Sequence, residues 1–276
     1  MIWSTDWFGS PCIDLRDAEA FQTEHISGTT SLAWSRLPSA MHELPDKHYP
    51  LKLLGTDKQL KLASDFLNEK GYTVEAVYGL DEHFWQWARS EAITESGCKT
   101  VPLWQANPLL ATHIDNIESL ISGRKALDLA CGAGRDAVFL AQRGWAVTAV
   151  DANKDSLHRC EGLANSSNTS LSTQCLDLEL QQPAMDNPSV DLIVVMRYLH
   201  RPLLPWLAKW LNPGGILCYS TFMVGCEKFG SPRNPNYLLK PDELANTYSD
   251  MKIVYDEVHH LNDGRPVVHF VAQNPA

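Results

Sequence analysis

Apolar residues recur along the chain in two successive series of predicted strands and helices. In the first series, short apolar runs predict strands, and a stretch with Leu60, Ala63, Phe66 and Leu67 on one face predicts a helix. The expected ranges are strands at 12–15, 51–54 and 74–78, a helical turn at 17–23 and a helix at 58–70. Gly71 follows that helix, in the position where a glycine commonly ends one.

The second series begins near residue 109 and is longer. It predicts helices at 109–121, 136–142, 154–164 and 203–210, and strands at 125–129, 146–150, 171–175, 190–195 and 215–220. Strands at 251–260 and 267–273 flank a turn sequence from Asn262 to Pro266 and predict an antiparallel hairpin. Because strands and helices alternate, we expect an α/β protein with parallel sheets covered on both faces, and the hairpin as an antiparallel edge.

Between the two series lies a tryptophan-rich stretch of mixed pattern, residues 81–111. We place a domain boundary within it, so that residues 1–95 form one α/β domain and residues 96–276 form a second. The length of 276 residues suits one large domain or two modest ones.

Composition excludes several classes of protein. The net charge of −10 argues against a broad basic surface for nucleic acid, because phosphate contacts need clustered Lys and Arg. No apolar run approaches the ~18 residues that span a bilayer, and the first residues lack the features of a signal peptide. The seven cysteines show neither paired nor Cys-x-x-Cys spacing, so we expect no disulfide framework and no metal site. A cytoplasmic protein with reduced thiols is the expectation.

The clearest chemical signal is the sequence from Asp128 to Gly134, Asp-Leu-Ala-Cys-Gly-Ala-Gly. An apolar strand ends at an acidic residue and enters a glycine turn that leads into a helix. Glycines are needed where a backbone must pass close to a ligand. The next strand ends at Asp151, where a carboxylate can bind both hydroxyls of a ribose, and Asp177 follows the strand after that.

This spacing resembles the class I S-adenosylmethionine-dependent methyltransferases over roughly residues 103–276, near the tellurite-resistance type. The resemblance implies S-adenosylmethionine as the cofactor. It implies contacts to the methionine part from Asp128 and the turn Gly132–Gly134, to the ribose from Asp151, and to the adenine from Asp177 and Leu178. Three further residues at the strand ends are assigned to the same site: Ala130, Ala152 and Met196.

A nicotinamide-binding Rossmann domain is the alternative for this segment. The Gly-x-Gly turn lacks a third glycine three residues later, as pyrophosphate binding would require. The terminal hairpin also fits the methyltransferases better.

The methyl acceptor is expected beside the loop that follows the strand 190–195. Methyl transfer from a sulfonium is an in-line displacement, so the protein chiefly aligns the nucleophile and removes its proton. The candidates are Arg197, Tyr198 and His200 in that loop, and Arg233 and Asn234 in the long stretch 221–243. The alternatives are that Tyr198 and His200 only cap the sheet edge and that the stretch is a structural lid. No Asn-Pro-Pro-Tyr-like tetrapeptide is present, which weakens an assignment to base methylation.

The N-terminal part resembles the rhodanese family through Asp14, Arg16, Phe21 and the segment from Glu24 to Gly28. Active rhodaneses place a nucleophilic cysteine after the next buried strand, and that position falls here on Leu54 or Gly55. Thiolate chemistry requires the thiol. The resemblance therefore implies a degenerate rhodanese-like fold without sulfur transfer, and Asp14 and Arg16 as a structural pair. Docking of a partner, homo-oligomer formation through this domain, and closure of the methyltransferase pocket remain open as its role.

These observations lead to three functional hypotheses. The first is a methyltransferase acting on a small polar metabolite, with a sulfur-bearing or heteroaromatic-nitrogen acceptor such as a thiolated imidazole. The second is an RNA or tRNA methyltransferase that grips its substrate with the N-terminal domain. The third is a protein that binds the cofactor without turnover.

Overall fold

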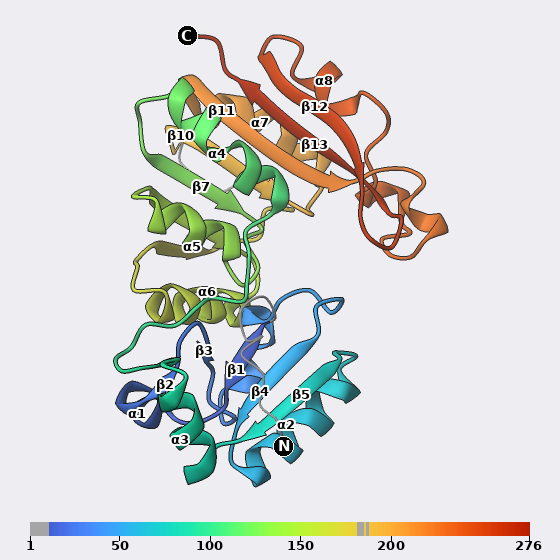
Figure 1. The fold of residues 1–276 in the computed structure, drawn as a ribbon. Helices are drawn as coiled ribbons and strands as arrows, with labels where there is room; N and C mark the ends of the chain where they lie inside the picture. Colours follow the sequence, from blue (N-terminus) through green and yellow to red (C-terminus); the bar gives the residue numbers. More distant parts are fainter. Residues whose placement is uncertain (1–10, 181–184, 186–187) are drawn as a thin grey trace. The chain divides into compact units, whose positions relative to one another are not determined.

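The computed structural model describes residues 11–180, 185 and 188–276, which fold into two compact units (Figure 1). The first unit comprises residues 1–104 and the second residues 105–276. Each unit has its own sheet and its own apolar core.

In the described part of the first unit, four parallel strands form a sheet in the order β3-β1-β4-β5. The strands are β1 (Cys12–Asp14), β3 (Thr30–Ser31), β4 (Leu51–Gly55) and β5 (Val74–Gly79). The helices are α1 (Ala18–Thr23), α2 (Asp57–Glu69) and α3 (Glu82–Ser90), and β2 (His25–Ile26) pairs with β6 (Thr94–Glu95) in an antiparallel ladder. The described part of this unit also contains the short 3-10 turns η1 (Leu37–Ser39) and η2 (Met41–Glu43).

Local sequence explains the two longer helices of this unit. Thr56 and Gln59 form a capping box at the start of α2, and the predicted residues Leu60, Ala63 and Leu67 are buried. Helix α3 lies in the tryptophan-rich stretch that showed no clear period. It starts because the Asp81 side chain accepts a hydrogen bond from the Phe84 amide.

The first unit extends beyond the boundary expected between residues 95 and 96. The amide of Ser31 donates to Thr100 Oγ1 at 2.8 Å, and the amide of Val101 donates to the carbonyl of Thr29 at 3.2 Å. Leu103 packs against the core of the same unit. Residues up to Trp104 therefore belong with the first sheet.

The described residues of the second unit form a seven-stranded sheet in the order β12-β13-β11-β10-β7-β8-β9. Strand β13 runs antiparallel to both of its neighbours, and the other pairs are parallel. The predicted hairpin thus lies at one edge, with its second strand on the inner side. The strands are β7 (Lys125–Leu129), β8 (Ala146–Asp151), β9 (Ser172–Cys175), β10 (Val190–Met196), β11 (Leu211–Phe222), β12 (Lys252–His260) and β13 (Pro266–Gln273).

Helices cover both faces of this sheet (Figure 1). On one face, α4 (Pro108–Leu120), α5 (Arg135–Gln142) and α6 (Lys154–Ser166) pack on strand residues such as Ala126. On the other, α7 (Leu204–Trp210) and α8 (Glu243–Thr247) pack on the alternate residues, including Leu127. Among the helices of the described segments, none is both long and apolar enough to cross a membrane.

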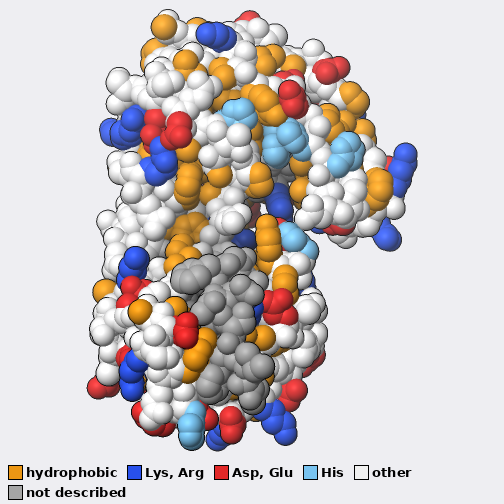
Figure 2. All heavy atoms as spheres, in the orientation of Figure 1, with side chains coloured by type: hydrophobic (Ala, Val, Ile, Leu, Met, Phe, Trp, Pro, Cys, Tyr) orange, Lys and Arg blue, Asp and Glu red, His pale blue; other side chains and the backbone are white. Residues whose placement is uncertain are grey.

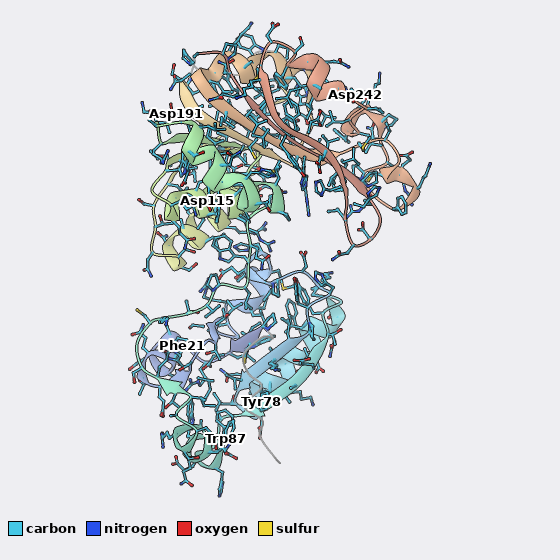
Figure 3. All side chains as sticks on the ribbon, turned by 45° about the horizontal axis from the view of Figure 1, so that its top comes forward. Phe21, Tyr78, Trp87, Asp115, Asp191 and Asp242 are labelled. Atoms are coloured by element: carbon cyan, nitrogen blue, oxygen red, sulfur yellow. The ribbon has the colours of Figure 1, made fainter. Side chains whose placement is uncertain are left out.

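The amino ends of three strands are tied together at Asp191, which is labelled in Figure 3. Its carboxylate accepts from the Lys125 amide at 2.9 Å and from Asn212 Nδ2 at 2.8 Å. The opposite ends of β7, β8, β10 and β11 lie side by side through the parallel register. The turns that leave those ends carry the predicted site residues.

Candidate active site

The glycine turn after β7 has the backbone geometry that its sequence requires. Gly132 and Gly134 have φ angles of 55° and 77°, in the left-handed region that favours glycine. A Cβ added to Gly134 would lie 2.1 Å from Cys160 Sγ on α6, so only glycine fits there. A Cβ added to Gly132 would meet no atom within 4 Å, so that side of the turn is open to a ligand.

Asp151 connects the end of β8 to this turn. Its Oδ2 accepts a hydrogen bond from the Gly132 amide at 2.9 Å, and its Oδ1 accepts one from the Asn153 amide at 2.8 Å. Each carboxylate oxygen has a second lone pair, so the group can still accept two hydroxyl donors. Asp151, the residue predicted to bind the ribose, is therefore held in place by the same backbone that forms the turn.

The turn after β9 carries the residues predicted to contact adenine. Asp177 is exposed, and its Oδ1 accepts from the Glu179 amide at 2.9 Å. Leu178 is buried in the core beneath it. The amide of Leu176 donates to the Asp151 carbonyl at 3.0 Å, which joins this turn to the end of β8.

Asp128 lies under the first turn of α5 and is 2% exposed. It accepts a hydrogen bond from the Ala137 amide, while its Oδ2 has no partner among the described residues. Burial raises the pKa of Asp128 well above its ordinary value, and the charge of Asp136 raises it further. An orphaned carboxylate oxygen beside an open glycine turn fits a ligand that brings a hydrogen-bond donor or a cation.

Asp136 was not among the predicted site residues. Its Oδ1 accepts a hydrogen bond from the Asn107 amide at 2.6 Å, which fixes the start of α4 beside the glycine turn. Burial raises the pKa of Asp136 to about 6, against the lowering effects of that amide and of Arg135 and Arg197. Arg135 and Asp136 after the glycines were visible in the sequence, but only the fold shows that the half-buried Asp136 faces the buried carboxylate of Asp128.

The loop after β10 begins at a strained residue. Arg197 has a φ of 57°, which is uncommon for a residue with a side chain. Its amide donates to the Ser220 carbonyl at 2.6 Å, across from β11. Met196 pairs with Ser220 in the same register. Local strain of this kind is found preferentially at functional sites.

Tyr198 lies next to the predicted cofactor residues. Its hydroxyl is buried without a hydrogen-bond partner among the described residues. Burial raises the pKa of Tyr198, and the nearby charges of Glu179, Asp177 and Asp151 contribute to the same direction. The Tyr198 carbonyl accepts from Tyr219 Oη at 2.8 Å, which holds the loop to the sheet. Tyr198 is thus a neutral phenol at neutral pH.

The other acceptor candidates have different surroundings. His200 precedes the 3-10 turn η3 (Arg201–Leu203), and its carbonyl accepts from the Leu203 amide at 2.9 Å. Asn234 caps η5 (Pro235–Tyr237), because its Oδ1 accepts from the Asn236 amide at 3.0 Å. Arg233 is exposed. Asn234 therefore has a structural task that the sequence did not disclose.

Arg201 joins the two predicted acceptor loops, and sequence reasoning missed it. Its Nε and Nη2 donate to the two oxygens of Glu243 at 2.6 and 2.9 Å. Its remaining contacts are the carbonyls of Asn236 at 2.9 Å and Leu238 at 2.8 Å. A guanidinium can make such a set because its donors lie in one rigid plane. Arg201 and Glu243 are 42 residues apart, so no local pattern could have paired them.

Histidines gather on the face of the sheet that α4 covers, a second feature that sequence reasoning missed (Figure 2). His259 stacks on His269 with ring centroids 4.3 Å apart, and Tyr255 Oη lies 2.8 Å from His259 Nε2. His113 of α4 packs on Tyr255. Burial lowers the pKa of His269 to about 4, and both other histidines lower it further. His269 of β13 pairs with Ser220 of β11, which in turn pairs with Met196 at the end of β10.

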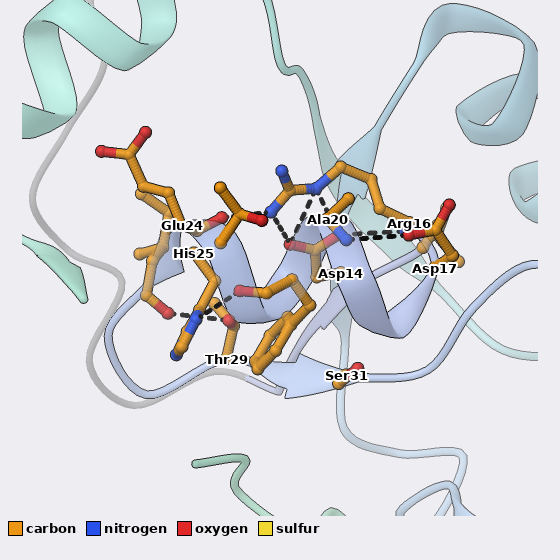
Figure 4. A network of polar contacts seen from close by, with 12 residues as sticks. Asp14, Arg16, Asp17, Ala20, Glu24, His25, Thr29 and Ser31 are labelled. Atoms are coloured by element: carbon orange, nitrogen blue, oxygen red, sulfur yellow. Dashed lines mark hydrogen bonds and ion pairs between the residues drawn. The ribbon is translucent and has the colours of Figure 1, made fainter. Parts of the chain in front are cut away.

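Within the described residues, no group of three or more His, Cys, Asp or Glu side chains is arranged to hold a metal ion. In the first unit, Arg16 binds Asp14 through Nη2 and Oδ2 at 2.6 Å and also donates to the Glu24 carbonyl at 2.8 Å (Figure 4). His25 Nδ1 lies 2.8 Å from the Phe21 carbonyl in the same network. These polar groups are used within the fold.

The chain matches the family model described as tellurite resistance protein TehB over residues 105–263. Among curated proteins, it is 28% identical to the probable S-adenosyl-L-methionine-dependent methyltransferase TehB of Haemophilus influenzae, over 54% of this chain and 54% of that protein. It is 34% identical to the ubiquinone biosynthesis O-methyltransferase of Idiomarina loihiensis, over 44% of this chain and 51% of that protein. The chain thus spans about half the length of these two relatives.

Two further similarities extend this comparison. An uncharacterized protein of Schizosaccharomyces pombe, UNK4.09, is 22% identical over 95% of this chain and 93% of its own length, so the match includes both units. The crystal structure of TehB from Haemophilus influenzae superposes with a TM-score of 0.51 at 22% identity, covering 59% of this chain and 62% of that one. The structural likeness shows a shared Rossmann-like fold.

Proposed function

Because the chain belongs to the TehB family and carries an S-adenosylmethionine-dependent methyltransferase domain, we propose that it transfers the methyl group to a small polar metabolite. The observation that carries this proposal is the hydrogen bond from the Gly132 amide to the Asp151 carboxylate. It holds the carboxylate proposed for the ribose beside a turn that is open at Gly132, where the rest of the cofactor would lie.

The residues present fit the cofactor. Asp151 would hold the ribose, Asp177 and Leu178 the adenine, and Asp128 with the glycine turn the methionine part. Ala130, Ala152 and Met196 flank these groups at the strand ends. When bound, S-adenosylmethionine supplies a methyl group activated by its sulfonium.

The acceptor would lie between the loop after β10 and the loop after β11. Arg201 supports this, because its contacts to Glu243, Asn236 and Leu238 hold the two loops together. In this proposal Tyr198 and His200 align the nucleophile and His200 accepts its proton, while Arg197 and Arg233 bind an anionic group of the acceptor. Asn234 shapes the loop and offers its amide nitrogen.

A sulfur-bearing or heteroaromatic-nitrogen acceptor, such as a thiolated imidazole, suits this pocket best. A thiol or an imidazole nitrogen loses its proton near neutral pH and needs only a weak base such as histidine. Tyr198 adds a neutral hydroxyl that can donate a hydrogen bond. Arg233 could pair with a carboxylate, as in an amino-acid-like acceptor.

For the first unit we propose a rhodanese-like fold without sulfur transfer, acting in the cytoplasm as part of a protein without nucleic-acid or membrane partners. Any self-association would use this unit. RNA methylation is the rival function, and the net charge of −10 counts against it.

The test is transfer of labelled methyl groups into cell extract that is then separated into small-molecule, RNA and protein fractions. We expect the label in the small-molecule fraction. Label in RNA would establish the rival function, and absence of label beside intact cofactor binding would establish a binding protein without turnover. Asp155→Asn, a change at an exposed residue on α6, serves as the matched control.

The acceptor residues are tested in the same assay. Tyr198→Phe, His200→Ala and Arg233→Ala should each lower turnover about 100-fold, the lower end of the range for loss of a positioned proton-transferring group. Affinity for S-adenosylhomocysteine should remain close to that of the parent. If all three variants turn over like the parent, the acceptor pocket lies elsewhere.

A further inference from the structure

Two carboxyl groups face each other beneath the glycine turn, Asp128 buried and Asp136 half-buried. Asp128 is contributed by β7 and Asp136 by the first turn of α5. Asp128 Oδ2 has no hydrogen-bond partner among the described residues, and the only amide assigned to this carboxyl is that of Ala137. Asp136 is held by the Asn107 amide at 2.6 Å. Like charges at this depth repel strongly, so both groups cannot easily be ionised at once.

The surroundings of Asp128 disfavour its charge. The groups that face it are Asp136, Asp151 of β8, and the thiols of Cys160 on α6 and Cys131 in the turn. None of these is a cation. The positive end of α5, through the Ala137 amide, is the stabilising partner.

The surroundings of Asp136 differ, because cations face it. Arg135 of α5 and Arg197 of the loop after β10 both favour its ionised form, and so does the Asn107 amide. Cys218 of β11 also faces Asp136 and is kept neutral by burial. Within the pair, Asp136 therefore holds the negative charge more readily and Asp128 holds the proton.

We propose that Asp136 is a positioning residue that keeps Asp128 protonated in the free protein, and that Asp128 releases this proton when the cofactor's α-ammonium binds. The O–H bond of the Asp128 carboxyl breaks, the proton passes to the solvent, and the ammonium balances the new carboxylate charge. No other reactant is needed. The inference concerns cofactor binding and holds whichever acceptor is methylated.

The sign of the pH dependence follows from this exchange. The free protein binds one more proton than the complex, so affinity for the cofactor rises with pH. The rise ends above the raised pKa of Asp128, where the free protein has already lost the proton. Without Asp136, the repulsion that raises this pKa is weaker, so the rise should move to lower pH.

The experiment is calorimetric titration of the full chain with S-adenosylhomocysteine at pH 7, in phosphate and in Tris, whose heats of protonation differ. We expect release of about one proton per ligand bound. The ligand 5′-methylthioadenosine lacks the amino-acid part, so it should bind without releasing a proton. Equal release with both ligands, or none with S-adenosylhomocysteine, overturns the inference without affecting the proposed methyl transfer.

Two variants test which carboxyl group releases the proton and which one keeps it bound in the free protein. Asp128→Asn should abolish proton release at pH 7, and Asp136→Asn should shift the rise in affinity to lower pH. The asparagine at 136 keeps an oxygen for the Asn107 amide, which limits structural damage. Asp155→Asn is the surface control and should leave the proton count unchanged. A pH profile of Asp136→Asn identical to that of the parent would show that Asp136 has only a structural role.

Discussion

Asp151 is the residue whose single side chain links two parts of the cofactor site. Both oxygens already accept backbone hydrogen bonds, from Gly132 and Asn153. A bound ribose would add hydroxyl donors to a carboxylate whose orientation is fixed beforehand. Such preorganisation strengthens binding, because little freedom is lost when the ligand arrives.

Replacing Asp151 by Ala should weaken binding of S-adenosylhomocysteine. Each hydrogen bond to a charged group contributes about 1.5–3 kcal/mol, or roughly ten- to hundredfold in affinity. Asp151→Asn keeps the shape and one acceptor oxygen, so it should lose less. Calorimetry on both variants measures the effect, and an unchanged affinity in Asp151→Ala would refute the assignment of Asp151 to the ribose.

At the residue scale, the sequence identifies side chains whose position depends only on neighbouring residues in the chain. The places of Asp128, Gly132 and Asp151 at a strand end or in a turn could be predicted from local sequence, and their role toward the cofactor stays a prediction. Asp136 and Arg201 could not be predicted, since their importance comes from partners brought together by the fold. The same reason hid the pairing of His269 with Ser220 of β11.

At the scale of secondary-structure elements, the glycine turn packs closely against α6. A side chain at Gly134 would collide with the Cβ of Cys160 at 2.7 Å as well as with its Sγ. Both atoms sit on a helix that packs in the core, so neither can move away without shifting α6. The close approach of turn and helix is what places the open side of the turn toward a ligand.

Gly134→Ala should therefore destabilise the second unit by about 1–3 kcal/mol, the usual effect of overpacking, in addition to the strain of a positive φ. Gly144→Ala isolates that strain, because Gly144 has a φ of 86° and open space around it. Urea unfolding of both variants gives the difference between their free energies of unfolding. Cys160→Ala removes the sulfur and should recover part of the loss in the double variant. Equal stabilities of Gly134→Ala and Gly144→Ala would mean that the collision is absent.

Element by element, periodicity predicted the strands and the longer helices of the second unit, because each buries one regular face, but it did not predict the short helix α8. Helix α3 was missed, since its tryptophans obscured the period and its capping residue Asp81 was not recognised. Strand β11 runs from Leu211 to Phe222, well beyond the predicted 215–220. The ends of strands depend on pairing with neighbours such as β10 and β13, which local sequence does not show.

The whole molecule combines the methyltransferase unit with the α/β unit that precedes it, the first unit. The boundary lay later than the sequence suggested, because residues near Thr100 hydrogen-bond to the first sheet without any strand-like pattern of their own. Such a segment can be assigned to one of the two units only from its contacts in the structure.

The first unit should have no thiosulfate sulfurtransferase activity. In rhodaneses, the nucleophilic cysteine is expected in a loop after the buried strand. Here β4 ends at Gly55 and α2 begins at Asp57, with Thr56 as the capping residue between them. This connection has no room for a loop of amides around a thiolate. The thiols of this unit in the sequence are Cys12 and Cys98, and burial raises the pKa of Cys12 far above neutral pH.

Incubation of the full chain with thiosulfate and cyanide should therefore yield thiocyanate no faster than the same protein after heat denaturation. Cys98 is exposed, so any slow reaction of its thiol should vanish in Cys98→Ala. Turnover that persists in Cys98→Ala and is lost in Cys12→Ala would contradict the prediction. It would mean that β1 opens enough to expose the Cys12 thiol, and that the first unit transfers sulfur after all.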